Sequence, residues 1–174
     1  MGINIVTGLG QRTGTSFVMQ KIKEKGLPIC GEKFLNGITV EKHNPNGYWD
    51  INPLQLSELI SNNKLDNKFC KLWANVLQFI PQENTNLIIV LERKNKEQQL
   101  SSMQKVLNDE LELPMNKIFY SGETVKDIYE NTVTLLNAWL QHKDKSKILH
   151  IYTEELDNSL SSIYNFIERG LKCH

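Results

Sequence analysis

Short apolar runs alternate along this chain with longer segments of helical periodicity, and this alternation restricts the possible folds more than any other feature. The runs are rich in Val, Ile and Leu and cover residues 3–8, 27–30, 68–73, 86–93 and 147–152. The segments between and after them predict helices over 15–25, 53–63, 95–108 and 124–141, and from 156 onward. Because strands that alternate with helices imply right-handed crossovers, we expect a three-layer α/β fold. Its mainly parallel sheet of about five strands would have helices on both faces.

The composition is that of a globular chain with no strong overall charge. The 174 residues are 40% hydrophobic, and 20 basic residues balance 20 acidic ones. The length favours a single domain over 1–174, and the charge balance predicts neither a nucleic-acid partner nor a membrane partner. No apolar run approaches the roughly 18 residues that span a bilayer, and the first residues lack a signal-peptide layout, so we expect a cytoplasmic protein. The three cysteines, Cys30, Cys70 and Cys173, show no metal-ligand spacing and are interpreted as reduced thiols.

The first predicted strand leads into a glycine-rich turn, "GLGQRTGTS" (8–16), and then into a predicted helix. This order of elements forms an anion site, because the first N–H groups of the helix are unpaired and its dipole is positive there. The triphosphate-binding motif G-x-x-x-x-G-K-[ST] requires lysine at the position of Thr15 and glycine at that of Leu9. The dinucleotide motif G-x-G-x-x-G also fails, because Thr13 stands where the third glycine belongs. The loop therefore predicts phosphate binding but disfavours ATP hydrolysis.

The loop resembles a motif of the sulfotransferase family, P-[KR]-S-G-T-[ST], with Gln11 in place of the proline and Thr13 in place of the serine. The matching residues are Gln11, Arg12, Thr13, Gly14, Thr15 and Ser16. The resemblance implies a P-loop NTPase-like fold and a 3′-phosphoadenosine 5′-phosphosulfate co-substrate held by these six residues, with Arg12 on the 5′-phosphosulfate. The stretch "NPNGYWD" (44–50) is similar to one in some short microbial and phage members. Its Tyr48 and Trp49 either stack on adenine or acceptor or form a small satellite core.

Further positions match the same family in order along the chain. Arg93 ends the fourth predicted strand and Ser101 follows eight residues later, which resembles the family's 3′-phosphate motif. An arginine suits this role because its planar fork donates two hydrogen bonds to one phosphate. Lys71, at the end of the third predicted strand, matches a lysine that contacts the transferring sulfuryl group. The resemblance extends from residue 5 to about 156.

Two residues compete for the role of general base. "GLPICGEKF" (26–34) resembles a region of tyrosylprotein-type sulfotransferases in which a glutamate after Cys-Gly is the base, and this implies Glu32. His43 lies in the long polar loop that follows, and its imidazole is well suited to proton transfer near neutral pH. The sequence leaves both open.

The resemblance predicts transfer of a sulfuryl group to a small-molecule or peptide hydroxyl acceptor, without a metal. The chain departs from the family in being short and in lacking the R-K-G-x-x-G-D-W-K ending of cytosolic members. Two alternatives therefore stand beside this prediction. One is a P-loop kinase of small molecules or nucleotides, and the other is a homologue that binds the nucleotide without turnover.

Overall fold

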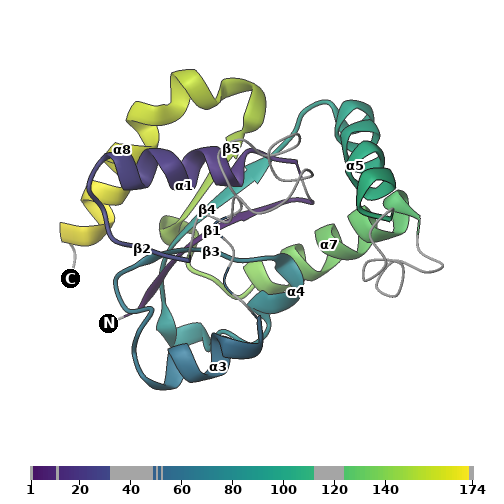
Figure 1. Ribbon diagram of the computed structural model, residues 1–174. Helices are drawn as coiled ribbons and strands as arrows, with labels where there is room; N and C mark the ends of the chain where they lie inside the picture. Colours follow the sequence, from purple (N-terminus) through teal and green to yellow (C-terminus); the bar gives the residue numbers. More distant parts are fainter. Residues whose placement is uncertain are drawn as a thin grey trace.

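The computed structural model describes residues 2–10, 12–31, 49, 51, 53–111 and 124–172 (Figure 1). Its strands are β1 (Ile3–Gly8), β2 (Ile29–Cys30), β3 (Phe69–Lys71), β4 (Thr85–Glu92) and β5 (Ile148–Tyr152). Its α-helices are α1 (Thr15–Glu24), α3 (Pro53–Ser61), α4 (Ala74–Leu77), α5 (Lys96–Leu111), α7 (Val125–Leu140) and α8 (Leu156–Lys172). Short 3-10 turns, η1 (Gln82–Asn84), η2 (Lys145–Lys147) and η3 (Thr153–Glu155), flank β4 and β5.

The strands form one five-stranded sheet in the order β2-β3-β1-β4-β5, and every pair of neighbours is parallel. The predicted α/β fold with a parallel sheet of about five strands is therefore confirmed. β1 lies at the centre and pairs along its whole length with β4. Both strands are almost entirely buried, which explains why each reads as a continuous apolar run.

Each face of the sheet carries its own core, and alternate residues of β4 supply both. Ile88 and Val90 pack with the side chains of α3, α4 and α7, whereas Leu87, Ile89 and Leu91 pack with those of α1 and α8. This alternation follows from the two-residue period of a strand. Figure 1 shows α1 and α8 together on one side of the sheet. The predicted covering of both faces is therefore confirmed.

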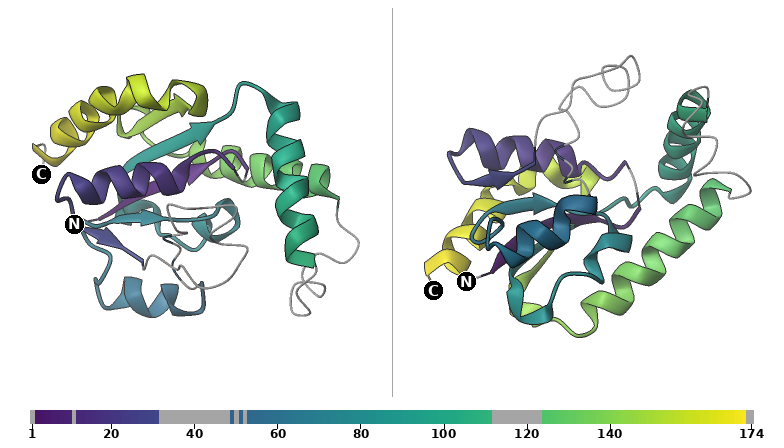
Figure 2. Two further views of the ribbon diagram at one scale, coloured as in Figure 1. Left: turned by 45° about the horizontal axis from the view of Figure 1, so that its top comes forward. Right: turned by 60° about the horizontal axis from the view of Figure 1, so that its bottom comes forward.

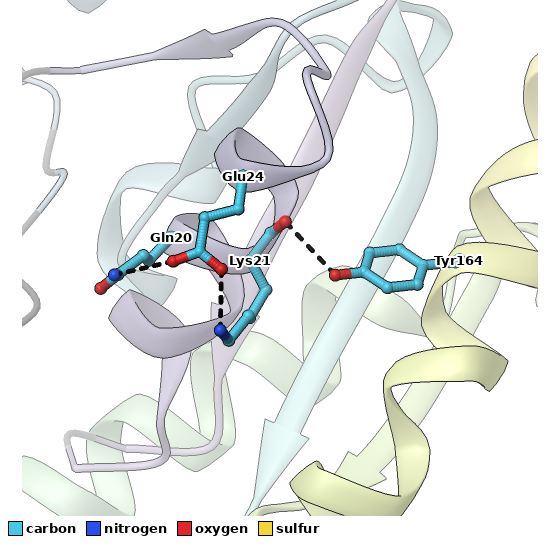
Figure 3. A network of polar contacts seen from close by, with 4 residues as sticks. All are labelled: Gln20, Lys21, Glu24 and Tyr164. Atoms are coloured by element: carbon cyan, nitrogen blue, oxygen red, sulfur yellow. Dashed lines mark hydrogen bonds and ion pairs between the residues drawn. The ribbon is translucent and has the colours of Figure 1, made fainter.

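α1 and α8 also meet through polar contacts at the surface of their shared layer. The Tyr164 hydroxyl on α8 donates to the Lys21 carbonyl oxygen on α1 at 3.3 Å (Figure 3). Lys21 also pairs with Glu24 at 2.7 Å, one turn further along the same helix. This exposed ion pair lies within α1 and adds little stability. The two helices are joined mainly by burial of their apolar faces in the shared core.

α5 stands at the end of the sheet where β4 finishes, apart from the two covering layers (Figure 2). It crosses α7 and contacts it through a small apolar cluster centred on Met103 and Val125. α7 begins with a capping box in which Thr124 and Asp127 exchange side-chain and backbone hydrogen bonds. α5 and α7 both lie next to the loop that follows β1, because Gln99 of α5 and Tyr129 of α7 are close to Gly10.

Several details differ from the sequence-based expectation. The sequence does not predict the short helix α4, and β2 has only two residues because Pro28 removes a ladder donor just before it.

Trp49 is 3% exposed within the core of the α1 and α8 layer, and its ring lies 4.9 Å from Lys23 Nζ. Of its two predicted roles, the structure supports the packed one. Among the helices described, none has the length and apolar character needed to cross a bilayer.

The two-sided core can be tested on adjacent leucines of α7. Leu136 is fully buried against the sheet, whereas Leu135 is 40% exposed. We expect Leu136→Ala to lower the free energy of unfolding by about 2–5 kcal/mol, because it removes transfer energy and leaves a cavity. Leu135→Ala is the matched control and should cost less than about 1 kcal/mol in the same urea titration. Equal losses would contradict the packing of α7 described above.

Candidate functional site

The centre of the sheet has the arrangement at which open α/β sheets bind ligands. β1 is followed by α1 on one face and its neighbour β3 by α4 on the other, whereas α5, which follows β4, stands at the end of the sheet. The chain segments that leave these three carboxyl ends therefore diverge, and the region between them, the crevice, is the place where open α/β sheets bind ligands. The loop after β1 lies in this crevice together with Lys71, at the end of β3, and Arg93, directly after β4.

The loop between β1 and α1 has a backbone conformation that explains its glycines. Gly10 and Gly14 have φ of 87° and 85°, in the region that glycine tolerates best. Arg12 also has a positive φ, 65°, which is uncommon for a residue with a side chain and typical of functional loops. At Gly8 a Cβ atom would lie 2.0 Å from Thr13 Oγ1, so the two ends of the loop touch.

Buried polar groups hold the loop in place. Gln99 of α5 is fully buried, and its Nε2 donates to the Leu9 carbonyl oxygen at 2.9 Å. The Thr153 hydroxyl, just after β5, lies 2.7 Å from the Thr13 carbonyl oxygen and 3.1 Å from that of Glu92. The loop is therefore tied to α5, to the end of β4 and to the end of β5 by hydrogen bonds within the protein.

Positive potential and hydrogen-bond donors converge at the start of α1. Gly14 is the N-cap residue and supplies no capping side chain, so the helix begins without the usual acceptor for its first N–H groups. Lys71 Nζ donates to Ser16 Oγ at 3.2 Å, and both side chains are buried. The Trp73 ring lies 5.9 Å from the same Nζ, at the outer limit of a cation–π contact. An ammonium group thus lies beside the positive end of a helix dipole, an arrangement that an anion would stabilise.

Arg93 brings a second cationic group to the other side of β1. It is partly buried, and its Nε atom is shielded from solvent and has no hydrogen-bond partner among the described residues. A buried guanidinium donor of this kind is favourable only when an acceptor reaches it. Glu154 lies close enough to Arg93 for the charge of the guanidinium to affect its pKa. Burial alone would raise the pKa of Glu154, but amide hydrogen bonds from Lys94 and Asn95 and the charge of Arg93 together lower it.

Some of the remaining predicted site residues lie in the described part of the chain and others do not. Arg12 lies in the loop and its Nε donates to Ser102 Oγ on α5 at 3.1 Å, whereas the predicted Ser101 is exposed on the same helix. Thr13 and Ser16 are buried, and Gly14 and Thr15 are partly exposed at the start of α1. Gln11, Glu32 and His43 lie outside the described residues, so the structure places neither candidate base.

Gln99, Ser102 and Thr153 are the contributors that the sequence did not indicate. A glutamine or serine within a charged helix has no distinguishing pattern, and only the approach of α5 to the loop gives these two a role. Thr153 follows a predicted strand at the same edge as Lys71 and Arg93, and that position could have identified it. Among the described residues, no group of three or more His, Cys, Asp or Glu side chains could hold a metal ion.

The closure of the loop can be tested by a double-mutant cycle between Gly8 and Thr13. We expect Gly8→Ala to destabilise the fold by about 1–3 kcal/mol, because the added Cβ overlaps the Thr13 hydroxyl in a tightly packed site. In a Thr13→Ala background the same change should cost clearly less, since the clashing atom is gone. Urea titrations of the four proteins measure both effects, and strictly additive losses would refute the contact.

No protein-family model matches this chain, and no match is found among curated proteins. The functional assignment therefore depends on the residues and geometry of the crevice.

Proposed function

We propose that this chain has a P-loop NTPase-like, sulfotransferase-type fold, binds 3′-phosphoadenosine 5′-phosphosulfate and transfers its sulfuryl group to a hydroxyl acceptor. The observation that carries the proposal is the contact between Lys71 and Ser16 at the uncapped start of α1. The loop sequence has threonine where a triphosphate-binding loop has lysine, and here an ammonium group reaches the same helix end from β3. The strand order and the position of the loop after the central strand are compatible with this fold.

The crevice offers separate places for two anionic groups of one ligand. Lys71, Ser16 and the first N–H groups of α1 lie on the β3 side of β1 and would hold the 5′-phosphosulfate. Arg93 lies on the β4 side and would hold the 3′-phosphate, for which its buried Nε is a suitable donor. Arg12, whose Nε donates to Ser102 Oγ, would contact the 5′-phosphosulfate, as the family resemblance implies. This separation favours a bisphosphorylated nucleotide over a simple triphosphate chain.

The proposed chemistry requires alignment and charge stabilisation more than covalent help. The donor supplies a sulfuryl group whose bond to a phosphate oxygen breaks as the acceptor oxygen attacks. The fixed ammonium of Lys71 would stabilise the negative charge that develops at the reacting oxygens, as preorganised donors do in phosphoryl transfer. The rigid loop would hold the reacting group in position. The proton of a small-molecule or peptide hydroxyl would pass to Glu32 or His43, and both assignments remain predictions.

The proposal is tested by comparing nucleotides in the absence of magnesium. Adenosine 3′,5′-bisphosphate should bind more tightly than AMP and should raise the melting temperature more than ADP does, because only it offers a group to Arg93. Arg93→Gln should weaken binding of the bisphosphate about tenfold to hundredfold, because a charge-assisted hydrogen bond contributes about that much to affinity. Binding of AMP should not change. Lys71→Gln should weaken both ligands. Arg169→Gln, at an exposed arginine of α8, is the matched control and should change neither.

Other outcomes separate the alternatives. Equal affinity for AMP and the bisphosphate in the wild-type protein, or no binding, would reject the assignment of a 3′-phosphate site. Binding of ATP that requires magnesium would favour a kinase. Tight binding of the bisphosphate, with no sulfuryl transfer from the donor to a panel of phenols, sugars and peptides, would favour a binding protein without turnover.

A further inference from the structure

Cys30 and Cys70 are direct neighbours on the parallel strands β2 and β3. Adjacent strands are about 4.8 Å apart and register partners project from the same face of the sheet. This spacing lies within the range of about 4.4–6.8 Å between the Cα atoms of disulfide-bonded cysteines. Both thiols are free in this structure. The sequence alone could not pair them, because their proximity depends on the order of the strands.

The two thiols contact each other and differ in exposure. Cys70 is fully buried, whereas Cys30 is partly exposed on the edge strand. The Cys70 thiol donates to the Lys68 carbonyl oxygen, 3.7 Å from Sγ, and the Cys30 sulfur is an alternative acceptor within its reach. Because a thiol carries one hydrogen, a negative charge on Cys30 would draw that hydrogen toward the Cys30 sulfur.

This contact sets the order in which the two groups ionise. The hydrogen bond from Cys70 lowers the pKa of Cys30 to about 6 and outweighs the opposite effect of burial, with help from the Gly31 backbone and the Lys68 charge. The pKa of Cys70 is raised, because it donates that hydrogen bond and is buried. The pair therefore favours the thiolate at the accessible position and the protonated thiol at the buried one. A thiolate is the nucleophilic form of cysteine.

We propose that Cys30 and Cys70 form a reversible redox site that reacts with small disulfides such as glutathione disulfide. The Cys30 thiolate attacks one sulfur of glutathione disulfide, forms a mixed disulfide and releases one glutathione thiolate. Cys70 then loses its proton and attacks the Cys30 sulfur, which releases the second glutathione and closes the bond between the strands. Two protein thiols are oxidised and one glutathione disulfide is reduced to two glutathione molecules.

The position of this pair links it to the crevice. Cys70 is followed directly by Lys71, so the new bond would join β2 to β3 one residue before the lysine that contacts Ser16, on the opposite face of the sheet. An accessible thiolate next to a resolving thiol is the usual arrangement of a redox-sensitive cysteine. The inference does not depend on the proposed function, since thiol chemistry alone is its readout.

The test uses the full chain with Cys173→Ser, which leaves the pair as its only cysteines. The protein is incubated with glutathione disulfide at pH 7, quenched with acid, alkylated and weighed by mass spectrometry. We expect the mass of an internal disulfide, lower by two hydrogens, and its reversal by reduced glutathione. A protein that keeps both thiols, or that stops at a mixed disulfide, would overturn the proposal.

Two variants resolve the steps. With Cys70→Ser in this background the reaction should stop at a glutathione adduct on Cys30, because no second sulfur is present. With Cys30→Ser the buried Cys70 should stay unmodified. An adduct on Cys70 in the second variant would contradict the assigned order of attack.

Alkylation of Cys30 by iodoacetamide gives an independent readout. Its rate should rise with a midpoint near pH 6, well below the value of about 8.5 for an ordinary cysteine. Cys70→Ala, which removes the donor, should raise the midpoint and lower the rate at pH 7 about two- to fourfold, because the loss of thiolate outweighs the higher nucleophilicity of a more basic sulfur. An unchanged midpoint in that variant would overturn the role of Cys70.

Discussion

The pairing of β1 with β4 is the constraint on which the rest of the structure depends. Every residue of β1 from Ile3 to Gly8 has a partner on β4, and alternate side chains of β4 enter the two cores. This pairing aligns the ends of the two strands, with Gly8 opposite Leu91. The glycine loop and Arg93 therefore start from the same edge, from which α1 departs over one face while α5 stands at the end of the sheet. The crevice results from this topology before any side chain contributes to it.

Three cationic side chains lie at one edge of the sheet, although the chain as a whole has no net charge. Arg12, Lys71 and Arg93 come from three segments far apart in sequence and all lie at the carboxyl edge of the sheet. The overall field does not attract an anion, so recognition of an anion here would depend on short-range donors held by packing. The hydrogen bonds from Gln99 and Thr153 matter for this proposal, because they tie the loop to neighbouring elements of the protein itself. Binding of an anion to such a preformed loop would not carry the entropic cost of ordering the loop.

Sequence reasoning succeeded where the information was local. β1 was predicted with its observed ends, and β4 and α7 came within a residue or so, because long apolar or amphipathic runs determine them. The convergence of Lys71 with the start of α1 could be suggested only by a family resemblance, since nothing near residue 71 indicates where α1 lies. The contact of Arg12 with Ser102 rather than Ser101 and the juxtaposition of Cys30 and Cys70 could not be foreseen. Each depends on contacts between segments that the sequence does not order in space.

The most direct test of the central claim is a crystal structure of the protein with adenosine 3′,5′-bisphosphate. The account predicts the 5′-phosphate against Ser16, Lys71 and the first N–H groups of α1, and the 3′-phosphate within hydrogen-bond distance of the Arg93 guanidinium. The opposite end of the sheet provides the contrasting site, a cavity lined by His142, Lys143 and Lys147 among others. A nucleotide bound in that cavity, with the crevice empty, would contradict the account.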